Sequence, residues 1–393
     1  KFFEGETKQL IKFRTYEQKQ AYENNFSTWA KGKSEYENLF TEYAKNYETW
    51  TPYSKHRQYI NEGILGSPLA AFAAQLIALE AALNKSGSAA ADIKKAIDAA
   101  SANRKAFLEA EDKVSDQKII AATSMMYYNN VDPSQHPVGY FDVIKSVYGD
   151  LNDEGAFRRM SKDMMSKTMI LDDAKWDAFI ANPDVKVLQA DPAFIYVAPI
   201  LKNYNTKYAP LYTAFVIKNN ELGKSYMKGI MEMNPAAAKK MYPDANLSMR
   251  VSYGNVKSYN PRDGIHCDYI CTAKGIMEKY VPGDYEFDLP AKQVELLKKR
   301  DFGQYIDKAK NDLVVTFITT NDITGGNSGS PVIDGSGNLI GLAFDGNYEA
   351  LSHKIAFDKD LNRTICVDVR YVLWCIDKLG GAKNLINEMK LVK

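Results

Sequence analysis

The hydrophobic pattern of this sequence changes once, near residues 234–246, and that change limits the folds open to the chain. Before it, apolar residues recur at helical spacing, with breaks at VDPSQHP and ANPD. After it come short segments rich in β-branched residues, separated by Asp-Gly and Ser-Gly pairs that are typical of hairpin turns. We therefore predict a helical domain over 1–242 and a β domain over 243–393 that ends in a helix.

Within the helical part, two amphipathic segments are expected in 6–49, and W-T-P-Y is expected to end the second because proline cannot continue a helix. A longer helix follows to about Asn84, and SGSAA at 86–90 supplies a turn and a cap. Further helices fit 88–113, 115–128, 139–149, 153–168, 172–182, 184–205 and 206–233. The expected strands are 247–258, 266–272, 285–288, 313–320, 331–334, 338–344 and 364–368, before a last helix over 370–389.

The segment TGGNSGSPVI, residues 324–333, places one serine among glycines in the manner of an acyl-transfer enzyme. Ser328 is the predicted nucleophile, and the N–H groups of Gly326 and Ser328 are predicted to form an oxyanion hole. A glycine-rich hairpin with an incidental serine also fits so short a motif. The strand-like LVVTFITT before it and VIDGSGNLIGLAFDG after it favour the catalytic turn that chymotrypsin-like barrels carry. Asp322, just before the motif, is interpreted as a turn residue.

The stretches GGNSGSPVID, GNLIGLAFDGN and RTICVDVRYVLW resemble the C-terminal end of the bacterial dipeptidyl-peptidase 7 and 11 family. The resemblance continues upstream through YNPRDGIHCDYICTAKGIMEKY and PGDYEFDLP to the tyrosine- and lysine-rich helices, so it covers essentially the whole chain. It implies an α+β serine exopeptidase with a large all-helical domain, then a chymotrypsin-like antiparallel β-barrel lobe that carries the serine, and a C-terminal helix. It also implies an oligopeptide substrate and export to the periplasm or cell surface, and it leaves open whether the protein is a homodimer.

A serine nucleophile of this kind needs a histidine base and a carboxylate that orients the histidine. None of the chain's histidines lies in a strand-end context such as T-A-x-H-C; they are His56, His136, His266 and His353. Only His266 lies in β-like sequence, and it belongs to the serine's own barrel, whereas this fold takes the base from the preceding barrel. The chain also opens abruptly at KFFEGETKQL. We expect the histidine and the aspartate to lie outside this chain, and the chain alone to be inactive.

The segment GLAFDGN, residues 341–347, is expected to form one side of the pocket for the residue before the scissile bond. Gly346 leaves that pocket open, whereas the resemblance implies an arginine here in relatives that select acidic residues. The chain is therefore placed on the dipeptidyl-peptidase 7 side, with a hydrophobic preference. Phe344 and Thr324 are expected to line the pocket. Asp345 is either a turn residue or a partner of the substrate's N-terminal ammonium.

Composition excludes several classes of protein. The chain has 50 Lys and Arg residues against 49 Asp and Glu, and a net charge of +1 argues against a general nucleic-acid surface. Its longest apolar run, residues 69–83, is too short and too polar for a membrane span. His266, Cys267 and Cys271 have ligand-like spacing without a second ligand pair, so free thiols are expected, with no metal and no cofactor.

Two other functions stay open at this point. A peptide-binding or scaffolding protein that kept a protease-like fold is consistent with a chain that lacks a competent base. An endopeptidase with an open cleft is disfavoured by the helical part, because cleavage restricted to the second peptide bond needs a wall that a helical domain supplies.

Overall fold

The computed structural model describes residues 2–85, 90–241 and 248–392. Its internal contacts divide the chain into two compact units, Gly32–Gly229 and a second formed by Lys1–Lys31 together with Ile230–Lys393. This grouping differs from the predicted division after residue 242, because the first two helices pack on the C-terminal part. Thr15 Oγ1 and Ser352 Oγ form a buried hydrogen bond of 3.2 Å.

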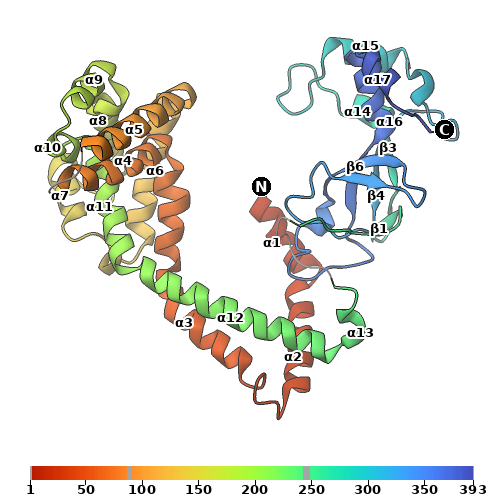
Figure 1. The fold of residues 1–393 in the computed structure, drawn as a ribbon, viewed down its shortest axis with the longest axis horizontal. Helices are drawn as coiled ribbons and strands as arrows, with labels where there is room; N and C mark the ends of the chain where they lie inside the picture. The colour runs from red at the N-terminus through yellow and green to blue at the C-terminus, as the bar shows by residue number, and fades with distance from the viewer. Residues whose placement is uncertain (1, 86–89, 242–247, 393) are drawn as a thin grey trace. The chain divides into compact units, whose positions relative to one another are not determined.

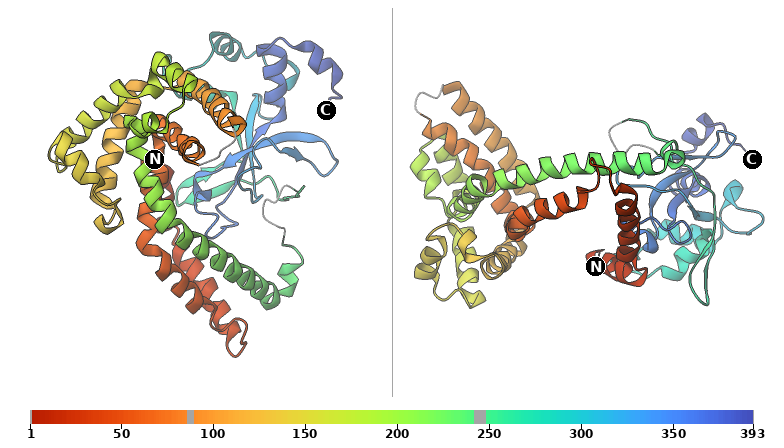
Figure 2. Two further views of the ribbon diagram at one scale, coloured as in Figure 1. Left: turned by 60° about the vertical axis from the view of Figure 1, so that its left-hand side comes forward. Right: turned by 90° about the horizontal axis from the view of Figure 1, so that it is seen from below.

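In the described residues of the unit Gly32–Gly229, helices are joined by turns and short loops, and there is no β-strand (Figure 1). Helices α3 and α12 lie side by side and antiparallel in all three views (Figures 1 and 2), and Phe40 contacts Tyr226 while Tyr47 contacts Phe215. The other helices surround a core that includes Leu69, Phe72 and Trp176. The helices with most or all of their length here are α3 (Leu39–Gln58), α4 (Pro68–Asn84), α5 (Ala90–Ala110), α6 (Lys113–Asn130), α7 (Tyr140–Tyr148), α8 (Glu154–Lys167), α9 (Asp173–Ala181), α10 (Val185–Gln189), α11 (Pro192–Lys207) and α12 (Ala209–Met233).

Proline has different effects at two places in this unit. Helix α3 continues through Pro52 to Gln58, so the predicted end at W-T-P-Y is wrong. Trp50, 6% exposed, packs on α12 there, and burial of such a side chain offsets much of the cost of a helical proline. By contrast, the predicted helix 184–205 divides before Pro192, where the Asp191 carboxylate caps α11. Residues 86–89 of the predicted SGSAA turn lie outside the described residues.

Two histidines of the helical unit lie among tyrosines. His56 is fully buried, and its Nε2 lies 2.8 Å from the Tyr127 hydroxyl. Burial, and secondarily the nearby His136, lower the pKa of His56 from its ordinary value near 6.5 to about 4. Burial also lowers the pKa of His136. Folding therefore favours the neutral form of both imidazoles.

Acid is expected to destabilise the helical unit through His56. The pKa of His56 is lower in the folded state than in the unfolded state, so the neutral imidazole contributes fully to the free energy of unfolding above pH 6.5. As the pH falls toward 4, this contribution is lost, and the free energy of unfolding decreases by about 3 kcal/mol in total. Urea unfolding followed by the helical circular dichroism signal at several pH values measures this change. The free energy of unfolding should change less steeply with pH between 6.5 and 4.5 in His56→Gln than in wild type. His266→Gln, at an exposed histidine, is the control and should keep the wild-type slope. Equal slopes in wild type and His56→Gln would contradict the assignment.

The second unit contains a five-stranded antiparallel sheet in the order β3-β4-β7-β6-β5, and a separate β1-β2 hairpin. The register places Phe317 opposite Cys366 and Gly346 opposite Thr364. Its strands are β1 (Tyr259–Arg262), β2 (Ile265–Cys267), β3 (Ile270–Thr272), β4 (Val314–Thr319), β5 (Pro331–Ile333), β6 (Leu339–Gly346) and β7 (Thr364–Asp368). Its helices are α1 (Phe2–Lys12), α2 (Thr15–Ala30), α13 (Pro235–Ala238), α14 (Ala273–Lys279), α15 (Ala291–Lys298), α16 (Val369–Trp374) and α17 (Lys383–Glu388).

The predicted fold class, a helical part followed by an antiparallel β lobe and a C-terminal helix, is confirmed, and the predicted last helix is divided into α16 and α17. The chymotrypsin-like barrel stays a prediction. The predicted strand 285–288 is wrong, because the Asp284 carboxylate accepts the N–H groups of Glu286 and Phe287 and forms a turn. Of the predicted strand 247–258, residue 247 lies outside the described residues, and Val256 forms a single bridge to Thr319.

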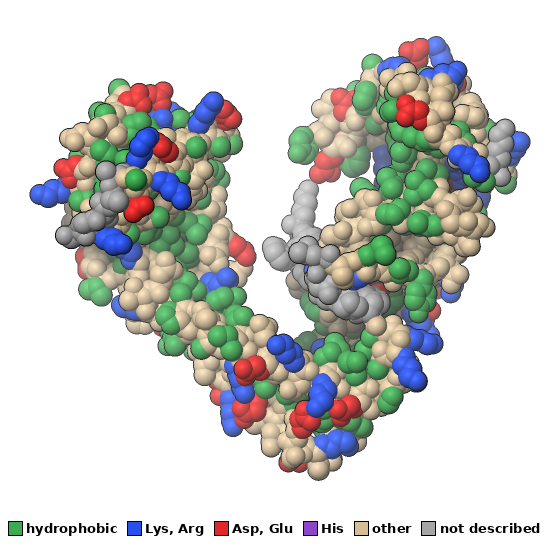
Figure 3. Space-filling model, in the orientation of Figure 1, with side chains coloured by type: hydrophobic (Ala, Val, Ile, Leu, Met, Phe, Trp, Pro, Cys, Tyr) green, Lys and Arg blue, Asp and Glu red, His purple; other side chains and the backbone are tan. Residues whose placement is uncertain are grey.

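The surface and the composition of this structure agree with a near-neutral chain. On the face shown in Figure 3, basic and acidic side chains are interspersed. No single described helix has the length and apolar content of a membrane span; α4 and the helical segment 39–66 reach them only as a pair bent by 106°. All four cysteines are free thiols, and within the described ranges no three His, Cys, Asp or Glu side chains are grouped to hold a metal.

Candidate active site

The predicted nucleophile lies on a tight turn between β4 and β5. Asn327 closes the turn, since its N–H donates to Thr324 O and its side-chain Oδ1 accepts the Thr324 N–H, each at 3.1 Å. Gly326 and Gly329 have φ values of 97° and 82°, which side chains with a Cβ rarely adopt. Ser328 is exposed between these two glycines. The glycines of the motif are therefore needed for the backbone path that presents the serine.

Two contacts attach this turn to β6. The Gly329 N–H donates to Ala343 O at 2.7 Å, and the Ser328 Oγ donates to Phe344 O at 3.4 Å. In the described turn, hydrogen bonds occupy the N–H groups of Thr324, Asn327, Gly329 and Ser330. Within the described ranges, the N–H groups of Gly326 and Ser328 donate to no other group, and their role as an oxyanion hole stays a prediction.

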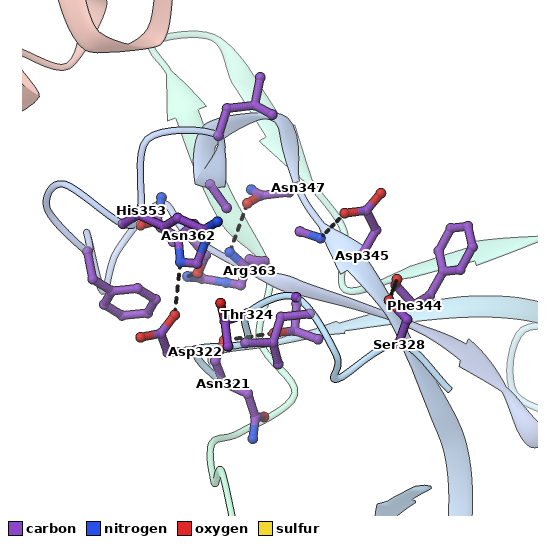
Figure 4. Close-up of a pocket in the computed structure, with 18 residues that line it drawn as sticks. Asn321, Asp322, Thr324, Ser328, Phe344, Asp345, Asn347, His353, Asn362 and Arg363 are labelled. Atoms are coloured by element: carbon purple, nitrogen blue, oxygen red, sulfur yellow. Dashed lines mark hydrogen bonds and ion pairs between the residues drawn. The ribbon is translucent and has the colours of Figure 1, made fainter. Parts of the chain in front are cut away.

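A pocket of about 270 Å³ opens beside Ser328 (Figure 4). Gly346 forms part of its wall, and a Cβ placed on Gly346 would lie only 3.2 Å from the Ala350 Cβ. Phe344 is 60% exposed at the pocket. The exposed Asp345 accepts the Gly346 N–H on its carboxylate at 2.7 Å. The lining segments are 321–325 with Ser328, 344–347, 350–351, 353–354, 357 and 362–364.

The segment Tyr348–Phe357, here called the pocket loop, supplies the wall opposite β6 and is held by a buried polar network. The Glu349 carboxylate accepts bonds from Asn347 Nδ2 at 2.9 Å and from the Tyr259 hydroxyl at 2.8 Å. Asn362 Nδ2 donates to Glu349 O at 2.7 Å. On the other side of the loop, Ser352 bonds to α2 as described above. The loop is thus fixed from both sides.

Arg363 lines the pocket, and its guanidinium is engaged mainly by the backbone around it. It is 2% exposed, and its guanidinium donates to four backbone carbonyl groups, those of Lys257, Ser258, Lys359 and Asn362. Desolvation lowers its pKa from the ordinary arginine value. These contacts make Arg363 a structural cation.

One carboxylate–imidazole pair lines the pocket. His353 Nδ1 lies 3.0 Å from Asp322 Oδ1, and the two side chains are 19% and 40% exposed. Asp322, interpreted from sequence as a turn residue, thus binds the pocket loop. The pair resembles a base with its orienting carboxylate, but in Figure 4 it lies at the opposite end of the labelled residues from Ser328. The Ser328 Oγ is instead bonded to Phe344 O.

The other three histidines form no hydrogen bond to Ser328 within the described ranges. His266 Nδ1 is bonded to Asn260 Oδ1 at 2.8 Å on the exposed β1-β2 hairpin. His56 and His136 are in the helical unit. All four histidines fall within the described ranges, and no hydrogen bond joins any of them to Ser328.

Five of the predicted site residues line one pocket, and they are Thr324, Ser328, Phe344, Asp345 and Gly346. Gly326 lies in the same turn. Their chemical roles stay predictions. The contribution of the pocket loop could not be predicted from its sequence, because 348–357 carries no motif and no periodic pattern. The one feature that could have indicated this loop is His353, which follows the predicted pocket segment 341–347 closely in the sequence.

An exposed serine on a glycine turn, next to a pocket bordered by β6, is an arrangement typical of a serine peptidase. The chain belongs to the peptidase S46 family, whose model matches residues 1–391, and this confirms the resemblance seen in the sequence.

Relatives with two different enzyme names are similar to this chain. It is 35% identical to an Asp/Glu-specific dipeptidyl-peptidase of Flavobacterium psychrophilum, over 99% of this chain and 53% of that protein. It is 36% identical to dipeptidyl-peptidase 7 of Phocaeicola vulgatus, over 99% and 53%. The crystal structure of Porphyromonas endodontalis DPP11 in complex with the dipeptide Arg-Glu matches with a TM-score of 0.83 and 26% identity, over 98% of this chain and 54% of that one. The chain spans about half the length of the curated relatives it matches.

Proposed function

We propose that this chain is the serine-bearing part of a dipeptidyl-peptidase that releases dipeptides from the N-terminus of oligopeptides. The observation that carries the proposal is the exposed Ser328, held on a turn between two positive-φ glycines at a pocket of about 270 Å³. The names of the S46 relatives support the dipeptidyl specificity.

In the proposed reaction, the Ser328 Oγ attacks the carbonyl carbon of the second substrate residue. Its proton passes to a histidine outside this chain, and the N–H groups of Gly326 and Ser328 stabilise the oxyanion. The protonated histidine then gives its proton to the nitrogen of the third residue as the C–N bond breaks, so the shortened peptide leaves and the dipeptide remains as an ester on Ser328. Water, deprotonated by the now neutral histidine, attacks this ester, and the dipeptide is released as the proton returns to the Ser328 Oγ. Asp345, exposed at the pocket, is proposed to bind the substrate's α-ammonium.

The second substrate residue is proposed to be hydrophobic. The pocket walls include Phe344, Ile323, Leu351 and Phe357, and position 346 is a glycine. Arg363 is committed to backbone carbonyl groups. An apolar side chain gains about 1.5 to 3 kcal/mol from burial, whereas a carboxylate without a partner is penalised. The proposed location is the periplasm or the cell surface, which cell fractionation tests.

Product analysis tests the proposed activity. The full-length product of the gene, incubated with a decapeptide of mixed sequence, is expected to release successive dipeptides that mass spectrometry identifies. N-acetylation of the peptide should slow release at least tenfold, because the α-ammonium then lacks the charge that Asp345 binds. Internal cleavage would favour an endopeptidase. Binding without cleavage would favour the alternative function, a non-catalytic peptide-binding protein, which is consistent with a chain in which no histidine is hydrogen-bonded to Ser328 within the described ranges.

A further inference from the structure

The pocket has two chemically different ends. Figure 4 shows Ser328 beside Phe344 at one end, and the pair of His353 and Asp322 at the other. The rest of the lining combines apolar side chains, which include Ile323, Ala350 and Leu351, with polar ones such as Thr324, Asn347 and Asn362. A substrate side chain that enters beside Ser328 and extends along the pocket therefore meets the imidazole with its tip.

The hydrogen bond between the two side chains fixes which nitrogen is available. An ionised carboxylate only accepts hydrogen bonds, so His353 Nδ1 carries a proton and donates it to Asp322 Oδ1. The Nε2 atom remains for a ligand. When the imidazole is neutral, Nε2 accepts a hydrogen bond, and a hydroxyl group can donate one.

The charge of the pair disfavours an acidic tip. With a neutral imidazole the pair carries one negative charge and presents only an acceptor at Nε2, so it does not attract a carboxylate; protonation of the imidazole removes the net charge and turns Nε2 into a donor. Lys354 also borders the pocket, but it is solvent-exposed, and water and salt weaken its attraction. The pocket thus combines apolar walls with a hydrogen-bond acceptor at the far end.

We infer that the His353–Asp322 pair determines specificity by binding the tip of the second substrate side chain, and that it selects tyrosine over phenylalanine. The ring of tyrosine packs between the apolar walls, and its hydroxyl group donates to His353 Nε2. This inference rests on the proposed dipeptidyl-peptidase function and narrows its substrate class to hydroxyl-tipped aromatic residues. A hydrogen bond of this kind, at a side chain that is 19% exposed, gives a preference of about three- to tenfold.

The test compares kcat/KM of the full-length gene product on matched dipeptidyl substrates with Tyr, Phe and Glu as the second residue. Wild type is expected to prefer Tyr to Phe by about three- to tenfold. His353→Phe removes the acceptor but keeps an aromatic ring, and the Tyr/Phe ratio should fall to about one. His353→Gln keeps an acceptor, and part of the preference should return.

Two further variants separate this inference from simpler explanations. Asp322→Asn removes a negative charge from the pocket and should raise the Glu/Phe ratio. His266→Phe, at an exposed imidazole on the β1-β2 hairpin, should leave the Tyr/Phe ratio at the wild-type value. A Tyr/Phe ratio near one in wild type, or a ratio that His353→Phe does not change, overturns the inference while the dipeptidyl activity stands. Absence of dipeptide release from every substrate overturns the proposed function itself.

Discussion

The isolated 393-residue chain is expected to hydrolyse dipeptidyl substrates at the background rate, at least about a thousandfold more slowly than the full-length gene product. The Ser328 Oγ is bonded to Phe344 O, and in the part of the chain that the structure describes it has no hydrogen bond to a histidine, so we expect its proton to lack an acceptor of suitable pKa. The Gly326 and Ser328 N–H groups alone stabilise an oxyanion that rarely forms. Release of a fluorogenic leaving group, measured for both proteins at equal concentration, gives the ratio.

Two controls define what that rate means. Ser328→Ala should abolish turnover by the full-length protein and leave the rate of the isolated chain where it was. If the isolated chain releases dipeptides rapidly and Ser328→Ala stops it, a base exists within the chain. His353, the histidine that lines the pocket, would then be the residue to substitute next.

Local sequence rules predicted the elements of this fold well where short-range chemistry decides them. The β-branched run 313–320 forms β4, and Asp334 with Gly337 closes the turn between β5 and β6. At two places where the predicted fold differs from the structure, tertiary contacts are the cause. The helix around Pro52 continues because Trp50 is buried against α12, which lies about 160 residues later in the sequence. The packing of Thr15 on Ser352 brings together residues that are 337 positions apart, and no local pattern encodes it.

The same distinction holds at the site. Ser328 and its glycines were predictable because the turn requires positive φ at fixed positions, which only a few residue types tolerate. Gly346 was predictable from its spacing to Ser328 once a strand was assumed there. The pocket loop was not, because Glu349 holds it through contacts to Tyr259 on β1 and to Asn362 just before β7. The contacts that hold this loop in place also bring His353 next to Asp322, which lies 31 positions earlier in the sequence.

Replacement of Gly346 is expected to reverse the specificity of the full-length enzyme. Wild type should cleave after Leu or Phe at least tenfold faster than after Asp or Glu, since ~1.4 kcal/mol gives a factor of ten. In Gly346→Arg, the new side chain starts 3.2 Å from the Ala350 Cβ and must extend into the pocket. Cleavage after Leu and Phe should then fall at least tenfold, while the Glu/Leu ratio rises because the guanidinium binds a carboxylate through two parallel hydrogen bonds. The measurement is kcat/KM on four matched substrates.

Matched variants at the same position separate volume from charge. Gly346→Met fills the pocket with a side chain of comparable length but no charge, so it should depress cleavage after Leu without raising relative cleavage after Glu. Gly346→Ala adds one methyl group against Ala350, and a smaller loss is expected because the pocket loop must move by only a few tenths of an ångström. A wild-type preference for Asp or Glu would contradict the role assigned to Gly346. The cation that binds the substrate carboxylate would then have to be sought elsewhere around the pocket, and Lys354 at its border would be the first to substitute.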